Sequence, residues 1–329
     1  DVVTSRTDVV GMDTAIFMNS KVWEASGHVS EFHDPMVDCK NCKARFREDH
    51  IDLDKNCPTC GVKEWTDARQ FNLMLKTHYG PSEDSSSVVY LRPETAQGIF
   101  VNFANAVTTS RAKLPFGIAQ IGKAFRNEIT TGNFLFRSRE FEQMEMEFFV
   151  KPDETSEWLE YWSNARLDWY KSLGVTEKKL KLRPHEDNEL AHYADACFDV
   201  EYEFPFGWSE LEGIADRGSY DLNQHAQHSG KKLTWFDSKT NEHITPAVVE
   251  ASAGVDRTVL TILVDAYHEE EVKGEQRVVL KLNPKVAPIT VAVFPLVNRD
   301  GMPEIAEKII DDLKGDFAAF FDAGGSIGR

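Results

Sequence analysis

Between residues 116 and 150 the sequence gathers arginines, carboxylates and aromatic rings that could do chemistry. We predict two strands here, joined by a turn at 130–133, where the residues tolerate turn geometry. Side chains two apart on a strand share a face, so Arg126 and Glu128 would project together. The second strand would carry a polar face with Arg139, Phe141, Gln143, Glu145 and Glu147. Its other face would be apolar, with Met144, Met146 and Phe148, so the polar face suits a cavity lined by a rigid sheet.

The same residues permit a simpler interpretation, which is a solvated sheet face with ion pairs between neighbouring strands. Each such pair would contribute about 0.2–1 kcal/mol and would have no chemical role. Residue types alone leave both interpretations open.

Four of the five cysteines form two Cys-x-x-Cys pairs, Cys39 with Cys42 and Cys57 with Cys60. The pairs are separated by fourteen residues, and the second has the form Cys-Pro-x-Cys-Gly. This spacing is typical of a zinc ribbon, in which four thiolates surround one tetrahedral ion. A redox pair and incidental buried thiols are the alternatives, but two knuckles at this spacing favour zinc. Because four cysteines leave no open coordination position, we expect the ion to be structural.

Composition limits the possible partners and location. A chain of 329 residues can hold one large domain with smaller modules. No apolar run approaches the ~20 residues that span a bilayer, and no signal-peptide pattern opens the chain, so we expect a cytoplasmic protein without membrane contact. The net charge of −17 argues against non-specific binding of nucleic acid. An RNA partner would need a local basic patch.

Several phrases resemble a known family. F-R-N-E at 125–128 and R-S-R-E-F-E-Q-M-E at 137–145 resemble the second signature motif of the class II aminoacyl-tRNA synthetases, and E-A-S-A-G-V-D-R at 250–257 resembles the third. R-P-E-T-A-Q-G at 92–98 resembles the phrase at the mouth of the amino-acid pocket in the homodimeric glycyl-tRNA synthetases. W-E-A-S-G-H at 23–28 resembles the end of that family's dimer-contact motif. The resemblance covers essentially the whole chain.

This resemblance implies an α+β fold, with the antiparallel sheet of a class II synthetase flanked by helices. The catalytic domain would cover residues 1–275, with a zinc-ribbon-like insertion at 30–66. A connector would follow at 276–288, and 289–329 would be the truncated start of an α/β anticodon-binding domain. From the residue patterns, we expect a helix at 151–174, then a strand, a helix and a strand at 289–295, 302–313 and 316–322.

For ATP, the resemblance implies that Arg126 bridges the substrate carboxylate and the α-phosphate. Glu128 would accept from the adenine amino group, and Arg257 would lie across the adenine or bind the γ-phosphate. Arg126 and Arg257 are the predicted catalytic residues. The residues predicted to bind ATP are Arg126, Asn127, Glu128, Phe136, Arg137, Ser138, Arg139, Glu140, Phe141, Glu210, Leu211, Gly254, Val255, Asp256 and Arg257. Mg²⁺ would bridge the phosphates without a dedicated protein cage.

For glycine, the resemblance implies that the carboxylates of Glu94, Glu145 and Glu250 surround the ammonium group. The residues predicted to bind glycine are Arg47, Glu94, Phe141, Glu142, Gln143, Met144, Glu145, Glu250, Ala251, Ser252, Ala253 and Gly254. Arg45 competes with Arg47 for its place. Filling the space where a Cβ would point would exclude larger amino acids sterically.

The resemblance therefore implies ATP-dependent activation of glycine to glycyl-adenylate, followed by transfer to the 3′ end of tRNA(Gly), by a homodimer. One alternative is a related enzyme that activates another small amino acid. Another is a catalytically inactive relative that binds nucleic acid as an accessory protein. Such a relative would be expected to lose the motif arginines, which this chain retains at Arg126 and Arg257.

One further cluster could suggest a metal site and consists of His185, Glu186, Asp187, Glu189 and His192. We favour a surface or helix-start cluster, because the resembled family has no metal at this place.

Overall fold

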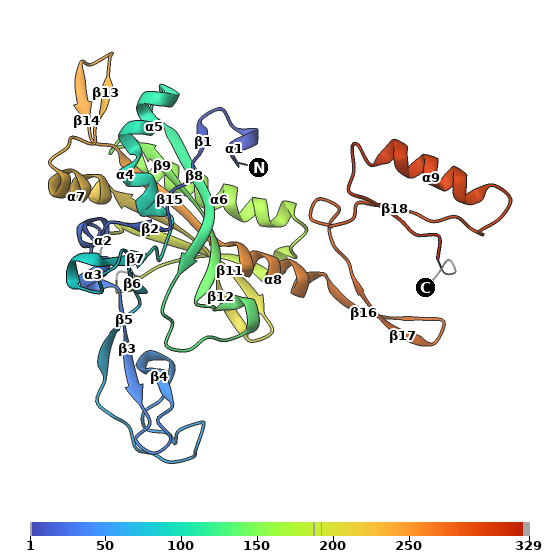
Figure 1. The fold of residues 1–329 in the computed structure, drawn as a ribbon, viewed down its shortest axis with the longest axis horizontal. Helices are drawn as coiled ribbons and strands as arrows, with labels where there is room; N and C mark the ends of the chain where they lie inside the picture. Colours follow the sequence, from blue (N-terminus) through green and yellow to red (C-terminus); the bar gives the residue numbers. More distant parts are fainter. Residues whose placement is uncertain (1, 187, 192, 325–329) are drawn as a thin grey trace. The chain divides into compact units, whose positions relative to one another are not determined.

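A computed structural model describes residues 2–186, 188–191 and 193–324 (Figure 1). The chain divides into two compact units. Unit 1 contains Asp1–Asp168 and Glu177–Thr261, and unit 2 contains Trp169–Thr176 and Ile262–Arg329. Within the described ranges, no helix combines the length and the apolar character needed to cross a bilayer.

Unit 1 is built on a seven-stranded sheet with the strand order β1-β8-β9-β15-β12-β11-β10. Its strands are β1 (Val9–Gly11), β8 (Phe116–Phe125), β9 (Glu140–Val150), β10 (Leu180–Pro184), β11 (Ala196–Phe204), β12 (Gly207–Gly218) and β15 (Ala247–Gly254). β1 pairs with β8 in parallel, and all other neighbours in this sheet pair antiparallel. The predicted α+β class with a mainly antiparallel sheet is confirmed.

The two strands predicted between residues 116 and 150 are β8 and β9, which pair from Phe116 opposite Phe149 to Phe125 opposite Glu140. Alternation along β9 separates its two faces as expected. Phe148 lies against Trp158 and Trp162 on one side, with ring centroids 4.7 and 5.1 Å apart. Both tryptophans belong to α6 (Thr155–Ser172), which is the helix predicted at 151–174.

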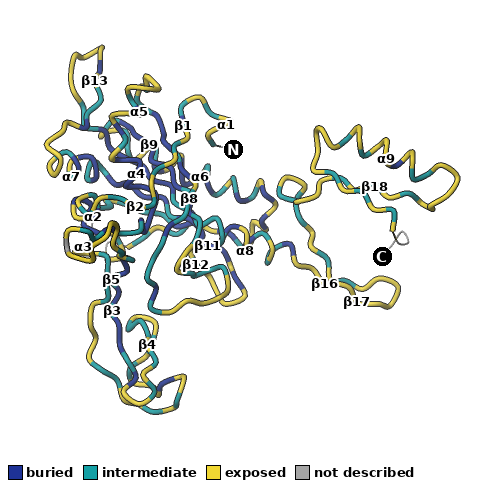
Figure 2. Tube along the Cα trace, in the orientation of Figure 1, coloured by how far each residue is buried: buried dark blue, intermediate teal, exposed yellow. Residues whose placement is uncertain are grey.

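The opposite face of the sheet is covered at one end by helices and left free for a site at the other. α4 (Ala96–Val101), α5 (Phe103–Ser110) and α7 (Tyr220–Ser229) bury an apolar cluster against β8, β9 and β15. In that cluster the ring of Phe149 lies 4.8 Å from the ring of Phe103. Figure 2 shows buried residues concentrated in the central strands and α4. The polar end of β9 is therefore held rigidly by a packed core.

Smaller elements surround this sheet in unit 1. β2 (Phe17–Met18), β7 (Val88–Leu91) and β6 (Lys76–His78) form one three-stranded sheet, and β4 (Arg45–Arg47), β3 (His33–Asp38) and β5 (Arg69–Asn72) form another. β13 (Trp235–Asp237) pairs with β14 (Glu242–Ile244). The remaining helical segments are α1 (Val2–Ser5), α2 (Ser20–Ala25), α3 (His28–Glu31), η1 (Glu48–His50), η2 (Ser85–Ser87), η3 (Phe134–Phe136) and η4 (Glu177–Lys179).

The described part of unit 2 contains two small β structures and one long helix. α8 (Val255–Ala266) begins in unit 1 and ends in unit 2, where β16 (Tyr267–Val272) pairs with β17 (Glu275–Leu280). A connector was expected from residue 276, but most of β17 lies in that range because it completes a hairpin with β16. The expected strand, helix and strand are β18 (Val291–Val293), α9 (Met302–Leu313) and β19 (Ala319–Phe321), with β18 and β19 parallel.

Candidate active site

One face of β9, β15 and β12 forms what we call the polar floor. Three cross-strand pairs of β9 and β15 make it up: Gln143 with Gly254, Glu145 with Ser252 and Glu147 with Glu250. On β12 the next neighbours are Gly213 and Ala215, whose small size leaves space above the sheet. Gln143, Glu145 and Glu147 are all buried, so the interpretation of this face as a solvated surface is wrong.

A cavity of about 120 Å³ lies at one end of the polar floor. Its walls are Arg126, Glu128, Leu135, Phe136, Arg137, Ser138, Phe141, Gln143, Glu210, Ser252, Gly254, Asp256 and Arg257. A wider hollow of about 850 Å³ shares the walls Phe136, Arg137, Glu210 and Arg257. Most of the residues predicted to bind ATP are thus brought together around one space.

Arg126 directly follows β8 and is held from three sides. Its Nε donates to the carbonyl oxygen of Pro93 at 3.0 Å. Its guanidinium carbon lies 5.4 Å from the ring centre of Phe141 and 5.5 Å from that of Phe32. Its terminal nitrogens have no hydrogen-bond acceptor in the part of the chain that the structure describes, so they remain available to an anion in the cavity.

Arg257 forms the opposite wall, at the start of α8. Its Nε donates to the carbonyl oxygen of Phe136 at 3.0 Å, and its Nη1 donates to that of Glu210 at 3.1 Å. The guanidinium lies 4.3 Å from the centre of the Phe136 ring. That ring also contacts Phe204 and Phe206 of the β11–β12 hairpin, at 5.2 and 5.0 Å. Aromatic packing therefore fixes both Arg257 and the loop after β8.

The loop between β8 and β9 supplies an ion pair to the cavity wall. Arg137 Nη1 lies 3.2 Å from Glu128 Oε2, and Arg139 Nε donates to the Glu128 carbonyl oxygen at 3.1 Å. Glu128 is buried, so the loop is anchored by its own charged residues. An anion that enters the cavity could replace the Glu128 carboxylate as the partner of Arg137, because both residues line the cavity.

Glu145 is fixed through both of its carboxylate oxygens. Oε2 accepts from the backbone N–H of Thr95 at 2.6 Å, and Oε1 accepts from Gln143 and Ser252 at 2.7 and 2.8 Å. Burial and the charge of Glu94 raise the pKa of Glu145. The amide oxygen of Gln143 is buried without a partner in the described part of the chain. It is an acceptor available to an N–H donor.

Glu250 shares one guanidinium with a second acid. Arg217 Nη1 donates to Glu250, while its Nε and Nη2 donate to Asp221 at 2.8 and 2.9 Å. Burial raises the pKa of Glu250 to about 8, although the charge of Arg217 opposes the shift. Beside it, Glu147 is fully buried, and both of its oxygens lack a partner among the described residues. Burial and the charge of Glu250 raise the pKa of Glu147 well above its usual range.

Glu94 completes this group of acids from the loop before α4. Its Oε1 accepts from Gln97 Nε2 at 3.1 Å, and its Oε2 lies 3.3 Å from His28 Nε2. Burial alone would raise the pKa of Glu94, but the charge and hydrogen bond of His28 lower it below its usual range. Carboxyl groups thus outnumber cations here, which favours a bound ammonium.

The other predicted site residues do not line the 120 Å³ cavity with their side chains. Four of them lie on the opposite face of the sheet because side chains alternate along a strand: Glu142, Met144, Ala251 and Ala253. Leu211 is buried in the core, and Arg139 and Glu140 are exposed. Asn127 and Val255 are next in the chain to residues that line the cavity. Glu142 contributes a backbone N–H, which donates to Asp256 Oδ2 at 2.7 Å and links β9 to α8. Side-chain contact with a ligand in that cavity is therefore not expected from these positions.

Arg47 lies on β4 and borders the wider hollow. Its Nη1 lies 2.8 Å from Asp34 and its Nη2 lies 2.6 Å from Asp49, whereas Arg45 is paired with Asp38 at 3.5 Å. Contact with an amino acid on the polar floor would require Arg47 to leave both carboxylates.

Three residues near the polar floor carry no role in the sequence prediction, and they are Arg217, Gln97 and His28. Arg217 follows Gly213 and Ala215 in the row of alternate β12 residues that faces the acids. That row of small residues ending in an arginine could have indicated a binding surface. Gln97 and His28 carry no such signal, because their roles depend on how α4 and α3 approach Glu94.

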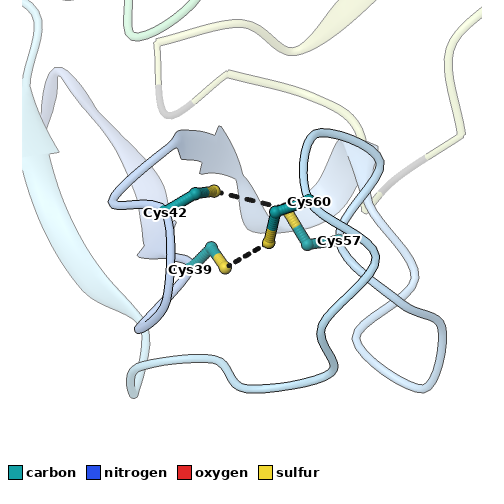
Figure 3. A group of neighbouring side chains, drawn as sticks. All are labelled: Cys39, Cys42, Cys57 and Cys60. Carbon is teal, nitrogen blue, oxygen red and sulfur yellow. Dashed lines mark hydrogen bonds between the residues drawn. The ribbon is translucent and has the colours of Figure 1, made fainter.

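The four paired cysteines converge at the tip of the second three-stranded sheet (Figure 3). Cys39 Sγ lies 3.6 Å from Cys60 Sγ, and Cys42 Sγ lies 3.8 Å from Cys57 Sγ. A tetrahedral zinc ion with Zn–S bonds of about 2.3 Å requires sulfur atoms about 3.8 Å apart. The observed spacings match that requirement, and none of the four is in a disulfide. These thiols could therefore hold one zinc ion.

In the cluster after β10, His185 contacts a carboxylate of β11. His185 Nε2 lies 2.8 Å from Asp199 Oδ2, and Arg183 Nη2 donates to the same oxygen at 3.1 Å. Cys197 is close enough to complete a three-ligand group. Arg183 and His185 therefore share one oxygen of Asp199 as charged or polar partners. Asp187 and His192 lie outside the described residues.

Comparisons with known proteins identify the family. Residues 79–266 match the model of the tRNA synthetase class II core domain (G, H, P, S and T). The chain is 55% identical to a glycine–tRNA ligase of Borreliella burgdorferi strain ZS7, with 98% of this chain and 74% of the relative covered. A glycine–tRNA ligase of Caldanaerobacter subterraneus is 53% identical, with 97% and 75% covered. One from Geobacillus thermodenitrificans is 50% identical, with 97% and 74% covered.

Solved structures share the fold at low sequence identity. The prolyl-tRNA synthetase of Cryptosporidium parvum, complexed with halofuginone and AMPPNP, superposes with a TM-score of 0.64 at 16% identity. That comparison covers 97% of this chain and 54% of the solved chain, so the chain spans about half the length of that structure. The sequence relatives, the core-domain match and the shared fold agree. The chain belongs to the class II aminoacyl-tRNA synthetases, in the family of the glycine–tRNA ligases.

Proposed function

We propose that this protein activates glycine with ATP and transfers it to the 3′ end of tRNA(Gly). The observation that carries the proposal is that an arginine-lined cavity and a group of buried acids lie side by side on one sheet. Arg126 borders the cavity with its terminal nitrogens available, and the polar floor beside it ends in a group of buried acids. An amino acid and a nucleotide phosphate could meet there.

In the first step, a glycine carboxylate oxygen attacks the α-phosphorus of ATP, and pyrophosphate leaves. Two anions must approach each other, and negative charge grows on the phosphoryl oxygens. A planar guanidinium can hold both groups with paired hydrogen bonds. We assign this role to Arg126, because Pro93, Phe32 and Phe141 hold it in place before substrate arrives. Mg²⁺ would bridge the phosphates and would be held mainly by phosphate oxygens and water.

The nucleotide would lie between the two arginine walls. Glu128 would accept from the adenine amino group, the Phe141 ring would stack on the base, and Arg257 would face it from the other side. Arg137 would leave Glu128 for a phosphate when ATP binds. In the second step the 3′-terminal hydroxyl of tRNA attacks the glycyl carbonyl carbon, and AMP leaves.

Glycine would bind through its ammonium group because it offers no side chain. The acids Glu94, Glu145 and Glu250 supply the negative charge, and the unpartnered amide oxygen of Gln143 supplies a further acceptor. We propose that the site excludes an added methyl group sterically, and such exclusion needs no editing site.

The proposal is tested by ATP–pyrophosphate exchange in Arg126→Ala, with Arg69→Ala as a matched control. Arg69 is an exposed arginine of β5 that pairs with Asp38 outside the cavity. Removal of one preorganised donor to a developing charge typically lowers the rate by ~10²–10³. We expect that loss in Arg126→Ala with an unchanged melting temperature, and wild-type exchange in Arg69→Ala. Near-normal exchange in Arg126→Ala would rule out this assignment.

We also propose that Cys39, Cys42, Cys57 and Cys60 hold one structural Zn²⁺. The support is the Sγ spacing, which fits a tetrahedral thiolate site. The ion would fix the tip of the β4-β3-β5 sheet and would take no part in adenylation.

Further proposals rest on the family resemblance. We infer that the protein acts in the cytoplasm as a homodimer with tRNA(Gly) as its partner. We also infer that residues 1–275 form the catalytic domain with its 30–66 insertion, and that residues from 289 belong to an anticodon-binding domain. A mass of twice the chain in light scattering would support the homodimer, and a monomer mass at assay concentration would exclude it.

A further inference from the structure

The segment from Ser26 to Phe32, which contains α3, contacts Glu94 and Arg126 of the candidate site. His28, the first residue of α3, is buried. Its ring lies between two aromatic neighbours, with centroids 5.4 Å from Trp23 and 5.3 Å from Phe32. The T-shaped packing on both sides fixes the plane of the imidazole.

Both ring nitrogens of His28 have polar partners. Nδ1 lies 2.8 Å from the hydroxyl oxygen of Ser26, and Nε2 lies 3.3 Å from Glu94 Oε2. The Ser26 hydroxyl also donates to the carbonyl oxygen of Trp23 at 3.3 Å, so its oxygen can accept from an N–H at Nδ1, while an N–H at Nε2 points at the Glu94 carboxylate. The Ser26 hydroxyl and the two aromatic neighbours together hold the ring with Nε2 facing Glu94.

The other oxygen of Glu94 is held from the opposite direction. Gln97 Nε2 donates to Oε1, and the amide oxygen of Gln97 lies 2.7 Å from His225 Nε2. His225 must donate in that contact because the amide oxygen can only accept, so the orientation of Gln97 is fixed. Glu94 is therefore clamped at both oxygens by groups that themselves have fixed partners.

We propose that His28 is a positioning residue for glycine binding, which holds the Glu94 carboxylate in the orientation that receives the substrate ammonium. The inference rests on the proposed function, because it takes Glu94 to be an ammonium ligand. His28 does not touch substrate and acts through Glu94. The same segment also places the Phe32 ring beside Arg126, so α3 supports the amino-acid pocket and the phosphate clamp together.

The effect should be confined to glycine binding. A carboxylate that is held at one oxygen only can rotate away from the ammonium, and the loss would be similar in the ground and transition states. Loss of such uniform binding raises KM and leaves kcat nearly unchanged. A hydrogen bond to a charged group is worth about a tenfold change in affinity or more.

Steady-state exchange kinetics of His28→Leu and His28→Gln test the inference. His28→Leu removes the donor, whereas the amide of His28→Gln can still donate an N–H toward Glu94. We expect His28→Leu to raise KM for glycine about tenfold or more, with KM for ATP and kcat within about twofold of wild type. We expect His28→Gln to recover most of that loss.

Equal KM values for glycine in the two variants, or a parallel rise in KM for ATP, would overturn the inference. If His28→Leu does not fold, Ser26→Ala tests the inference instead, because it removes the hydroxyl that contacts His28 Nδ1 and leaves the imidazole ring in place. It should raise KM for glycine by a smaller factor without changing KM for ATP, and no change would overturn the inference. Wild-type protein that shows no glycine-dependent exchange would contradict the proposed function instead.

Discussion

Glu145, Glu147 and Glu250 are buried on adjoining strands, where the charge of one ionised carboxyl group disfavours ionisation of the next. The guanidinium of Arg217 neutralises part of this charge through its ion pair with Glu250, but it also forms an ion pair with Asp221. Burial therefore raises the pKa of Glu250 to about 8 and raises that of Glu147 well above its usual range. A glycine ammonium would supply the missing positive charge, so substrate binding and carboxyl ionisation should be linked.

Glycine binding should consequently depend on pH. Because the pKa of Glu250 is raised, the group holds its proton below about pH 8 and is ionised above it. The ammonium binds the ionised form, so KM for glycine should fall as pH rises from 6 to 8, and KM for ATP should change little. In Glu250→Gln, KM for glycine should be raised and nearly independent of pH.

Exchange kinetics at saturating ATP across that pH range measure this effect, with KM for ATP in the same variant as the control. A KM for glycine that is flat in the wild type, or that has the same slope in Glu250→Gln, would show that Glu250 does not set the charge of the pocket.

Among the elements, β9 and β15 determine the site because their register sets three polar pairs on one face. Alternation along β9 was visible in the sequence. Burial of the polar face was not predictable, because it depends on α4 and α7 covering the same side of the sheet. The sequence likewise gave no reason to connect His28 or Gln97 with Glu94, since these contacts join distant segments.

Secondary structure was least predictable where residue patterns were weak. In β17, charged and apolar residues are mixed over six positions, and its strand character comes from pairing with β16. The cysteine pairs are the opposite case, because ligand spacing alone predicted that four thiols would meet. Metal-ligand spacing is a strong signal since one ion imposes a single geometry on all four residues.

The proposed zinc site should stabilise the β4-β3-β5 sheet without taking part in catalysis. Protein purified without chelator should contain one zinc per chain by metal analysis. Cys60→Ser should lose the ion and become sensitive to proteolysis within residues 39–66, because metal binding supplies the folding free energy of such small sites. Cys197→Ser, outside the group, is the matched control and should keep the ion. Metal-free wild-type protein would exclude the site.

At the scale of the molecule, a net charge of −17 must be reconciled with an RNA substrate. Overall charge repels a polyanion, so binding energy for tRNA must come from a limited part of the surface. For the anionic ATP, the proposed site in unit 1 offsets the overall charge locally, because Arg126, Arg137 and Arg257 line the cavity. Activation of the amino acid is therefore the part of the reaction on which the geometry bears most directly.

The measurement that tests this account most directly is ATP–pyrophosphate exchange by the wild-type chain with each of the twenty amino acids in turn. The account predicts rapid exchange with glycine and weak exchange with alanine and serine, because we propose that the site excludes a substrate Cβ sterically. Preferred exchange with another small amino acid would contradict the proposed specificity. Absence of exchange with all twenty would contradict the proposed enzyme itself.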